Sequence, residues 1–240
     1  MTSLNFNNVT VQYPIYNAHG MSLRNQLVRI STGGSIEKEA GHVQIVTALR
    51  NVSFNLKEGD SVALIGHNGA GKSTMLRTMA GVYTPISGHV TRKGRVATVL
   101  ELGAGMDPEL SGYENIIRMG VLLGMGMREI QERTEEIEEF TQLGDFLQLP
   151  VRTYSSGMST RLMFAVATST KPDIFLVDEI FGMGDAEFQV NAKRRMENLI
   201  KSVGIFVFAS HNNDLVKTYC NRFFRLEHGD VSEISYGEVG

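Results

Sequence analysis

The sequence SVALIGHNGAGKST at residues 61–74 decides the fold class of this chain. Residues 61–65 form a short apolar run, which predicts a strand buried on both faces. Residues 66–74 match the pattern G-x-x-x-x-G-K-[ST], and a helix is expected from about residue 72 to residue 80. Glycines at these positions let backbone N–H groups turn inward around an anion, and the N-terminus of the helix points at the same anion. The stretch therefore predicts an α/β protein with a phosphate-binding loop.

Two side chains of this loop have specific expected roles. Lys72 is expected to reach the β- and γ-phosphates of a nucleotide and so to take part in catalysis, and the Ser73 hydroxyl is expected to ligate Mg²⁺. An incidental glycine-rich turn is disfavoured, because the pattern lies between a buried strand and a helix, where its mechanism needs it. The candidate nucleotide-binding residues of the loop are Gly66, His67, Asn68, Gly69, Ala70, Gly71, Lys72, Ser73 and Thr74.

Polar side chains also follow two later apolar segments. Residues 174–177 are followed by Asp178 and Glu179, and His211 comes shortly after residues 205–209. Because ligands of open α/β sheets bind beyond the carboxyl ends of the strands, we expect these side chains near the phosphate loop. Asp178 is expected in the Mg²⁺ shell, and Glu179 is expected to orient or deprotonate the attacking water. His211 is a candidate γ-phosphate contact, although a histidine at a strand end is also commonly structural.

The segment Tyr154-Ser155-Ser156-Gly157-Met158-Ser159 precedes a helix that is expected over residues 160–170. Its small residues place a hydroxyl and free N–H groups at a helix N-terminus, which is a second potential anion site. An ordinary helix cap is the alternative interpretation. The position of the segment, just before the acidic strand, favours a functional role.

The composition excludes several classes of protein. Of the 240 residues, 42% are hydrophobic and 20% are charged, so the chain can bury a full core in one large domain or two small ones. The single Cys220 excludes an internal disulfide and a cysteine-rich metal site. The net charge of −3 disfavours a nucleic-acid partner.

Membrane segments and targeting signals are not expected. No apolar run approaches the ~20 residues that span a bilayer. The polar residues 1–14 do not have the pattern of a signal peptide. A soluble intracellular protein is therefore expected, and any association with a membrane would go through a partner.

The remaining patterns predict one α/β domain with a helical segment in its middle. Residues 14–46 interrupt the strand pattern, and a short amphipathic helix is expected around residues 21–30. Strands are expected over residues 4–13, 48–56, 89–90 and 96–100, with a terminal hairpin over residues 222–234.

The middle of the chain, from about residue 104 to residue 171, has helical periodicity. Ser111 and Glu114 form a capping-box pattern that opens a helix through residue 123. A second helix, over residues 127–143, has one apolar face and one face of glutamates that we expect to be solvated. These glutamates are Glu129, Glu132, Glu135, Glu136 and Glu139.

Together, residues 66–74, 154–159, 177–179 and 210–211 resemble, in this order, the motifs of the ATP-binding subunits of ABC transporters. The resemblance covers essentially the whole chain. It implies a P-loop ABC ATPase domain over residues 1–240, with ATP and Mg²⁺ as cofactors, in an ATP-sandwich homodimer. The implied parts are a RecA-like mixed-sheet core with an N-terminal antiparallel β portion, at about 1–103 and 172–240, and a helical subdomain at about 104–171.

The resemblance also implies roles for residues that the chemistry alone does not assign. Ser155 and Gly157 would bind the γ-phosphate of the ATP held on the other protomer. Asp185 would lie in a loop that contacts the opposing subunit. Tyr13, at the end of the first expected strand, would stack on adenine, with Tyr16 as the alternative.

Three departures from the family pattern point to one branch of it. Glu101 stands where most members have a glutamine, and we expect it among the nucleotide and metal contacts. The sequence YSSGM at residues 154–158 replaces the usual Leu-Ser-Gly-Gly-Gln, and residues 14–46 replace a short connection. With ELGAGMDPEL at residues 101–110, these departures resemble the ATPases of bacterial O-antigen, capsule and teichoic acid exporters.

The branch implies an ATPase that drives the export of lipid-linked polysaccharide across the inner membrane, with O-antigen as the first expectation and teichoic acid or capsule as alternatives. It places the chain on the cytoplasmic face as a peripheral protein. An integral membrane subunit would handle the polysaccharide, and the insert at 14–46 would face that subunit. Because only a few residues follow the terminal hairpin, we expect no C-terminal β-sandwich, which needs about 100 residues, and substrate choice would rest on the membrane partner.

Two rival functions are disfavoured. A soluble ABC ATPase that acts on ribosomes or DNA usually carries two ATP domains or a long coiled coil, and the balanced charge here also argues against it. A regulator with an inactive site is disfavoured because Lys72, Asp178, Glu179 and His211 are all present.

Overall fold

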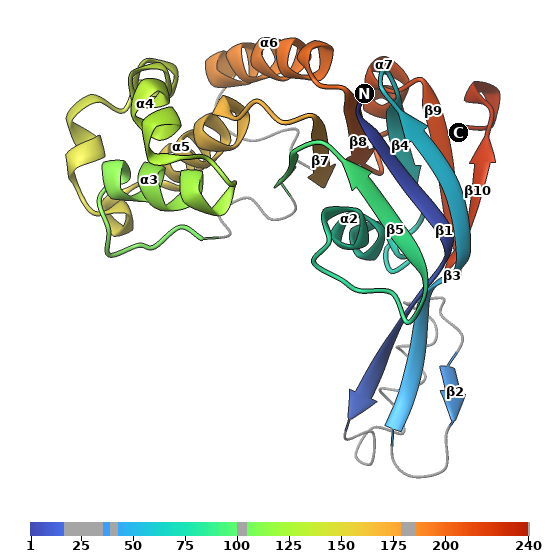
Figure 1. The fold of residues 1–240 in the computed structure, drawn as a ribbon. Coiled ribbons are helices and arrows are strands. Elements are labelled where there is room, and N and C mark those ends of the chain that lie inside the picture. Colours follow the sequence, from blue (N-terminus) through green and yellow to red (C-terminus); the bar gives the residue numbers. More distant parts are fainter. Residues whose placement is uncertain (17–35, 39–42, 100–104, 179–185, 240) are drawn as a thin grey trace.

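The computed structural model describes residues 1–16, 36–38, 43–99, 105–178 and 186–239, which form two β-sheets and the helices around them (Figure 1). The first sheet is antiparallel and has the strand order β2-β3-β1-β5. Its strands are β1 (Ser3–Tyr16), β2 (Ile36–Lys38), β3 (Val43–Lys57) and β5 (Ser87–Lys93).

The second sheet is mixed and has the order β10-β9-β4-β8-β7-β6. All neighbouring pairs in it are parallel except β10 and β9, which form an antiparallel hairpin. Its strands are β4 (Ser61–Ile65), β6 (Val96–Val99), β7 (Ile174–Asp178), β8 (Ile205–Ala209), β9 (Arg222–Glu227) and β10 (Asp230–Ile234). The inner strands β4, β7 and β8 consist mainly of continuous apolar runs, as expected where both faces of a sheet are covered.

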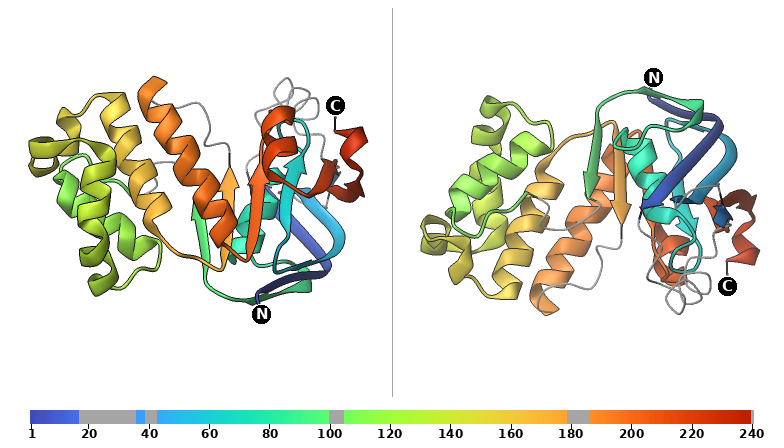
Figure 2. Two further views of the ribbon diagram at one scale, coloured as in Figure 1. Left: turned by 90° about the horizontal axis from the view of Figure 1, so that it is seen from above. Right: turned by 90° about the horizontal axis from the view of Figure 1, so that it is seen from below.

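Alternate residues of these buried strands enter two different cores. Leu64, Leu176 and Val207 face a core shared with the antiparallel sheet and α2 (Lys72–Ala80). Phe175 and Phe208 face a second core, on the side of α6 (Ala186–Ser202) and α7 (Asn213–Tyr219). Helix α2 thus lies between the two sheets, and α6 and α7 cover the outer face of the mixed sheet (Figures 1 and 2).

Three longer helices form a separate lobe beside the sheets (Figures 1 and 2). They are α3 (Gly112–Leu122), α4 (Met127–Thr141) and α5 (Ser156–Ser169), and their shared core includes Ile116, Ile137 and Leu162. Short 3-10 turns at η2 (Gly144–Gln148) and η3 (Val151–Thr153) connect α4 to α5, and another, η4 (Tyr236–Glu238), follows β10. Phe140 and Phe164 of the lobe pack edge-on against Phe188 of α6, which attaches the lobe to the mixed sheet.

Several predicted elements agree closely with the structure. Helix α2 spans the predicted residues, and the Ser111–Glu114 capping box is formed on both sides. The terminal hairpin turns at His228 and Gly229, both of which have positive φ, as a tight two-residue turn requires. The mixed sheet and the N-terminal antiparallel sheet are those of the predicted fold class.

The prediction for residues 14–46 is wrong at both ends of the segment. Strand β1 continues through Tyr16 rather than ending at Tyr13, and β3 begins at Val43 rather than at residue 48. Pro14 misled the prediction, because proline is normally excluded from inner strands. Pairing of β1 with β5 ends at Thr10, so Pro14 sits on an edge and pairs only with Ile45 of β3. The helix expected around residues 21–30 lies outside the described residues.

The prediction of a solvated glutamate face on α4 is also wrong in part. Glu129 pairs with Arg95 at 3.1 Å, and Glu136 pairs with Arg195 of α6 at 2.9 Å. These two carboxylates join the lobe to the rest of the molecule. Sequence periodicity separates apolar from charged faces, but it does not show which charged residues meet a charged neighbour.

Candidate functional site

The phosphate loop between β4 and α2 is tightly enclosed by its neighbours. Gly69 and Gly71 have φ values of 82° and 108°, which residues with a side chain rarely adopt. A Cβ added to Gly71 would lie 2.8 Å from the carbonyl oxygen of Ala48 in β3, and one added to Gly66 would lie 2.6 Å from that of Leu226 in β9. The glycine pattern is therefore required by close contact with two strands.

Lys72 is the first residue of α2, and its side chain folds back over the loop. Its Nζ atom donates hydrogen bonds to the backbone oxygens of Gly66 at 2.6 Å and His67 at 3.1 Å. The ammonium group is thus held among the backbone groups of the loop, a position suited to a charge-assisted hydrogen bond with a phosphate.

Ser73 and Asp178 are brought into direct contact, although 105 residues separate them. The Ser73 hydroxyl donates a hydrogen bond of 2.7 Å to Oδ2 of Asp178. Ser73 lies in the first turn of α2, and Asp178 ends β7. A hydroxyl and a carboxylate oxygen are hard donors of the type that Mg²⁺ prefers. Their contact is the geometry expected of a shared Mg²⁺ shell.

The predicted γ-phosphate contact, His211, lies near the same edge of the mixed sheet. Strands β7 and β8 are parallel, and Asp178 is in register with Ala209, two residues before His211. The expected adjacency of the acid-bearing strand and the histidine-bearing strand is therefore confirmed. Glu179, Glu101 and Asp185, which the sequence also singled out, lie outside the described residues.

Tyr13 lies beside α2 rather than at a strand end. Its hydroxyl donates to Oγ1 of Thr74 at 3.3 Å, and its ring meets Tyr83 edge-on with centroids 5.4 Å apart. Burial is the main cause that raises the pKa of the Tyr13 hydroxyl above its ordinary value. Tyr13 is therefore anchored next to the last residue of the phosphate loop. Its alternative, Tyr16, has a side chain outside the described part.

The Ser155 segment is at the N-terminus of α5, in the helical lobe and away from the phosphate loop of the same chain (Figure 1). The Ser155 hydroxyl accepts a hydrogen bond from the Met158 N–H at 3.2 Å, so the residue caps the helix. Ser155, Gly157 and Arg161 line a cavity of about 280 Å³. The structure thus gathers one set of predicted residues around the phosphate loop and leaves Ser155 and Gly157 as a separate group.

Sequence reasoning missed three neighbours of these groups. Arg161 lines the Ser155 cavity, Tyr83 packs on Tyr13, and His228 lies beside His67 with ring centroids 5.7 Å apart. Of the three, only Arg161 could have been expected from the sequence, because it lies in the helix that Ser155 caps. Tyr83 and His228 approach through tertiary packing, for which a single sequence has no signal.

The residues around the phosphate loop fit ATP and Mg²⁺. The backbone cradle has no room for side chains at Gly66 or Gly71, and Lys72 supplies the cation at its rim. The Ser73 and Asp178 oxygens supply the hard donors that a cation bound to phosphates needs. The donor set and the shape of the loop both suit a nucleotide triphosphate with its metal ion.

Comparisons with known proteins agree with this site. A family model described as ABC transporter matches residues 49–182, which include the phosphate loop, the Ser155 segment and Asp178. The O-antigen export system ATP-binding protein RfbE of Yersinia enterocolitica is 66% identical over 98% of this chain and 98% of its own length. RfbB of Klebsiella pneumoniae, of the same description, is 40% identical over 98% of this chain and 94% of its own length.

More distant similarities extend these findings. The teichoic acids export ATP-binding protein TagH of Bacillus anthracis is 35% identical over 98% of this chain, which spans 40% of that protein. Among solved structures, an ATP-binding cassette in a dimeric post-hydrolysis state, bound to ADP and Pi, has a TM-score of 0.70. It is 21% identical and aligns over 97% of this chain and 98% of its own, which confirms the predicted fold. The chain therefore belongs to the ABC transporter family, as one of its ATP-binding ATPase domains.

Proposed function

We propose that this chain is the ATP-hydrolysing subunit of an exporter that carries lipid-linked O-antigen across the inner membrane. One observation carries the proposal: a relative described as an O-antigen export ATP-binding protein matches at 66% identity over 98% of both chains. The contact between Ser73 and Asp178 beneath an enclosed phosphate loop supports the ATPase chemistry.

Within one protomer, several residues have separate roles around the nucleotide. The backbone of residues 66–71 binds the phosphates, and Lys72 stabilises the negative charge that develops during hydrolysis. Ser73 and Asp178 hold Mg²⁺, which neutralises phosphate charge when bound. Glu179 accepts the proton of the attacking water, and His211 contacts the γ-phosphate; Tyr13 stacks on the adenine. Glu101 adds a contact to the nucleotide and the metal ion.

The second half of the site comes from another copy of the chain. Ser155 and Gly157 line an open cavity on the lobe, away from the phosphate loop of their own chain. In a homodimer, the partner's phosphate loop faces this cavity, so that two ATP molecules lie between two protomers. Binding of ATP closes the dimer, and hydrolysis reopens it.

The chain acts at the cytoplasmic face of the membrane, bound to an integral membrane subunit that handles the polysaccharide. Among the helices that the structure describes, none combines the length and the apolar character that crossing a bilayer requires. Beyond the last pair with β5, strands β1 and β3 continue together as an arm (Figure 1). We infer that this arm carries residues 17–35 toward the membrane subunit, while the lobe at about 104–171 transmits closure to it.

Teichoic acid export is the second candidate function. It is favoured by TagH of Bacillus anthracis, which is 35% identical over nearly this whole chain. The O-antigen proposal is stronger because RfbE is almost twice as similar and matches over its own full length.

A cellular experiment separates these functions. Deletion of the gene in its host should remove O-antigen from the cell surface and leave lipid-linked O-antigen inside the cell. The wild-type chain should restore surface O-antigen, and a Lys72→Ala chain should not. Normal surface O-antigen after deletion, with loss of another surface polymer, would contradict the O-antigen assignment.

The catalytic assignment has its own prediction. A Glu179→Gln chain should keep ATP binding and lose hydrolysis, because the amide is close in shape but does not accept a proton as a base. With its γ-phosphate intact, ATP should hold two chains together, so the variant should elute as an ATP-dependent dimer in size-exclusion chromatography. The control is Glu139→Gln, at an exposed position on α4. Hydrolysis by Glu179→Gln at close to the wild-type rate would assign the base elsewhere.

A further inference from the structure

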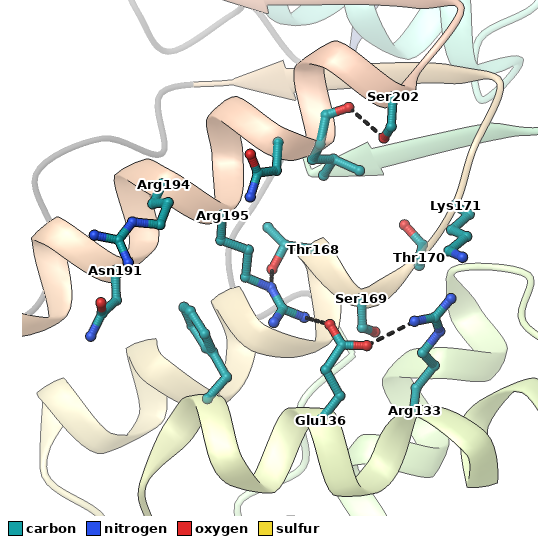
Figure 3. Close-up of a pocket in the computed structure, with 13 residues that line it drawn as sticks. Arg133, Glu136, Thr168, Ser169, Thr170, Lys171, Asn191, Arg194, Arg195 and Ser202 are labelled. Carbon is teal, nitrogen blue, oxygen red and sulfur yellow. Dashed lines mark hydrogen bonds and ion pairs between the residues drawn. The ribbon is translucent and has the colours of Figure 1, made fainter.

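A cavity of about 520 Å³ lies between α4, the end of α5 and α6 (Figure 3). Its size is within the range of pockets that bind small molecules. None of the residues that line it belongs to the phosphate loop or to the Ser155 segment. It is therefore a separate feature, at the junction between the helical lobe and the mixed sheet.

The charge of this cavity is strongly unbalanced. Among the described residues that line it, four are cationic, Arg133, Lys171, Arg194 and Arg195, and one, Glu136, is a carboxylate. Four positive charges and one negative charge give a formal total of +3, whereas the whole chain carries −3. A local excess of this sign favours an anionic occupant.

The one carboxylate is shared by two of the four cations. Glu136 accepts from Arg133 at 2.8 Å through one oxygen, and its other oxygen pairs with Arg195 at 2.9 Å. A guanidinium group has five N–H donors, so one shared carboxylate leaves donors of both arginines available. The arginines point toward each other across Glu136 in Figure 3.

Arg195 is held rigidly in the wall of the cavity. Its Nε donates to Oγ1 of Thr168 at 2.7 Å, and its guanidinium lies over the Phe140 ring at 4.4 Å from the centroid. Burial is the main cause that lowers the pKa of its guanidinium below the ordinary value, so a further anion nearby would stabilise its charge. A fixed and planar donor of this kind is suited to phosphate oxygens.

The other two cations line the rim, where a ligand would enter. Lys171 and Arg194 are exposed, and within the described ranges neither forms an ion pair or hydrogen bond with another residue. In Figure 3, Lys171 lies toward the end of the cavity occupied by Arg133, and Arg194 lies toward the opposite end with Asn191. Positive charge therefore lies at both ends of the cavity.

We propose that this cavity binds a small phosphate-bearing anion, such as a phosphate monoester or a diphosphate. Arg133 and Arg195 contact the phosphate oxygens from the wall, and Lys171 and Arg194 contact them from the rim. Phe140 and Leu199 provide an apolar surface for the remainder of the molecule. The proposal does not depend on the transported cargo. The shared chemistry is the phosphate group, whether it comes from a dissolved compound or from the headgroup of a membrane lipid.

The test uses inorganic pyrophosphate as the probe and calorimetry as the readout. The full chain carries Lys72→Ala, which removes the cation of the phosphate loop and limits binding there. We expect saturable binding with a Kd below about 1 mM, as a few charge-assisted hydrogen bonds provide. Adding Lys171→Gln and Arg194→Gln should weaken it by roughly tenfold or more.

A matched control separates this site from general charge effects. The control chain carries Lys193→Gln and Lys201→Gln, which also remove two positive charges. These exposed positions of α6 do not line the cavity, so the pyrophosphate affinity should be unchanged. Hydrogen exchange should show protection at residues 133–140 and 168–171 on adding pyrophosphate. Absence of binding, equal weakening by both double variants, or protection confined to residues 66–74 would overturn the proposal.

Vesicles identify the source of the phosphate. The same three chains are sedimented with vesicles of phosphatidylcholine alone or with added phosphatidic acid. Binding to phosphatidic acid that is lost only in the Lys171→Gln, Arg194→Gln chain supports a lipid headgroup as the source. Pyrophosphate binding without such vesicle binding supports a dissolved phosphate compound.

Discussion

The phosphate loop and the Ser155 segment both place glycine at the start of a helix, yet their surroundings differ. Gly71 precedes α2 with a φ of 108°, and its missing side chain faces the Ala48 carbonyl at 2.8 Å. Gly157 lies in the first turn of α5, and the nearest described atom that a Cβ there would meet, apart from its chain neighbours and the backbone of its own helix, is Oγ of Ser155 at 3.9 Å. Close contact within the chain requires a glycine at position 71, whereas the structure shows no such requirement at position 157.

This difference indicates how the two halves of the site are built. The phosphate loop is a complete cradle, because β3 and β9 enclose it and Lys72 bonds to its carbonyl oxygens. The Ser155 segment is a capped helix end beside an open cavity. In the proposed function, the cradle binds nucleotide within one chain, and the open helix end would receive its phosphate from a second molecule.

The largest effect is expected at Lys72. A Lys72→Ala chain should lose ATP hydrolysis by at least about a hundredfold, because preorganised charge at the developing phosphoanion is removed. Its thermal unfolding should match the wild type, since the hydrogen bonds of the ammonium group go to backbone oxygens of the loop. Lys57→Ala, at the exposed end of β3, is the control. Hydrolysis within a few-fold of the wild type would remove the phosphate loop from the mechanism.

The comparison is tested most sharply by the same change at the two glycines. Gly71→Ala should reduce the free energy of unfolding by roughly 1–3 kcal/mol, because alanine is strained at positive φ and meets a carbonyl. Gly157→Ala should leave it unchanged or raise it by up to about 1 kcal/mol, since alanine favours a helix.

Hydrolysis should nevertheless fall in both glycine variants. Denaturant unfolding measures stability, and phosphate release measures turnover. A Gly157→Ala chain that unfolds as easily as Gly71→Ala would show that the Ser155 segment is structurally constrained in the same way. Full activity of Gly157→Ala would show that the space beside this glycine has no role.

A small effect on stability is expected at Ser155. Ser155→Ala removes the cap on the Met158 N–H and should lower the free energy of unfolding by about 1 kcal/mol. Ser155→Asp keeps a capping oxygen and should retain stability, yet its negative charge would repel a phosphate and abolish hydrolysis. Calorimetric unfolding measures the stability of the two variants, and phosphate release measures their hydrolysis. Equal activity of Ser155→Asp and the wild type would contradict a phosphate contact at this position.

Local patterns in the sequence predicted most of the elements around the phosphate loop. The apolar run at 61–65 and the glycine pattern after it determine a buried strand, a loop and a helix with little dependence on distant residues. The contact of Ser73 with Asp178 was also predictable, because both follow parallel strands whose carboxyl ends meet at one edge.

The parts that sequence patterns did not predict depend on contacts between distant segments. Pro14 continues a strand because β5 ends before it, and Glu136 is paired because Arg195 of a later helix faces it. The approach of His228 to His67 depends on how the terminal hairpin packs against the loop. A sequence pattern within one segment does not predict which distant segment will pack against it.

One measurement tests the central claim that each ATP site combines the phosphate loop of one chain with the Ser155 segment of another. Lys72→Ala and Ser155→Asp chains are mixed in equal amounts, and phosphate release is compared with that of each chain alone. In a mixed dimer, one site joins the intact Lys72 of one chain to the intact Ser155 of its partner. Random pairing makes half of the dimers mixed, so activity should recover to about a quarter of the wild type. A mixture no more active than the sum of its two inactive chains would contradict the shared site.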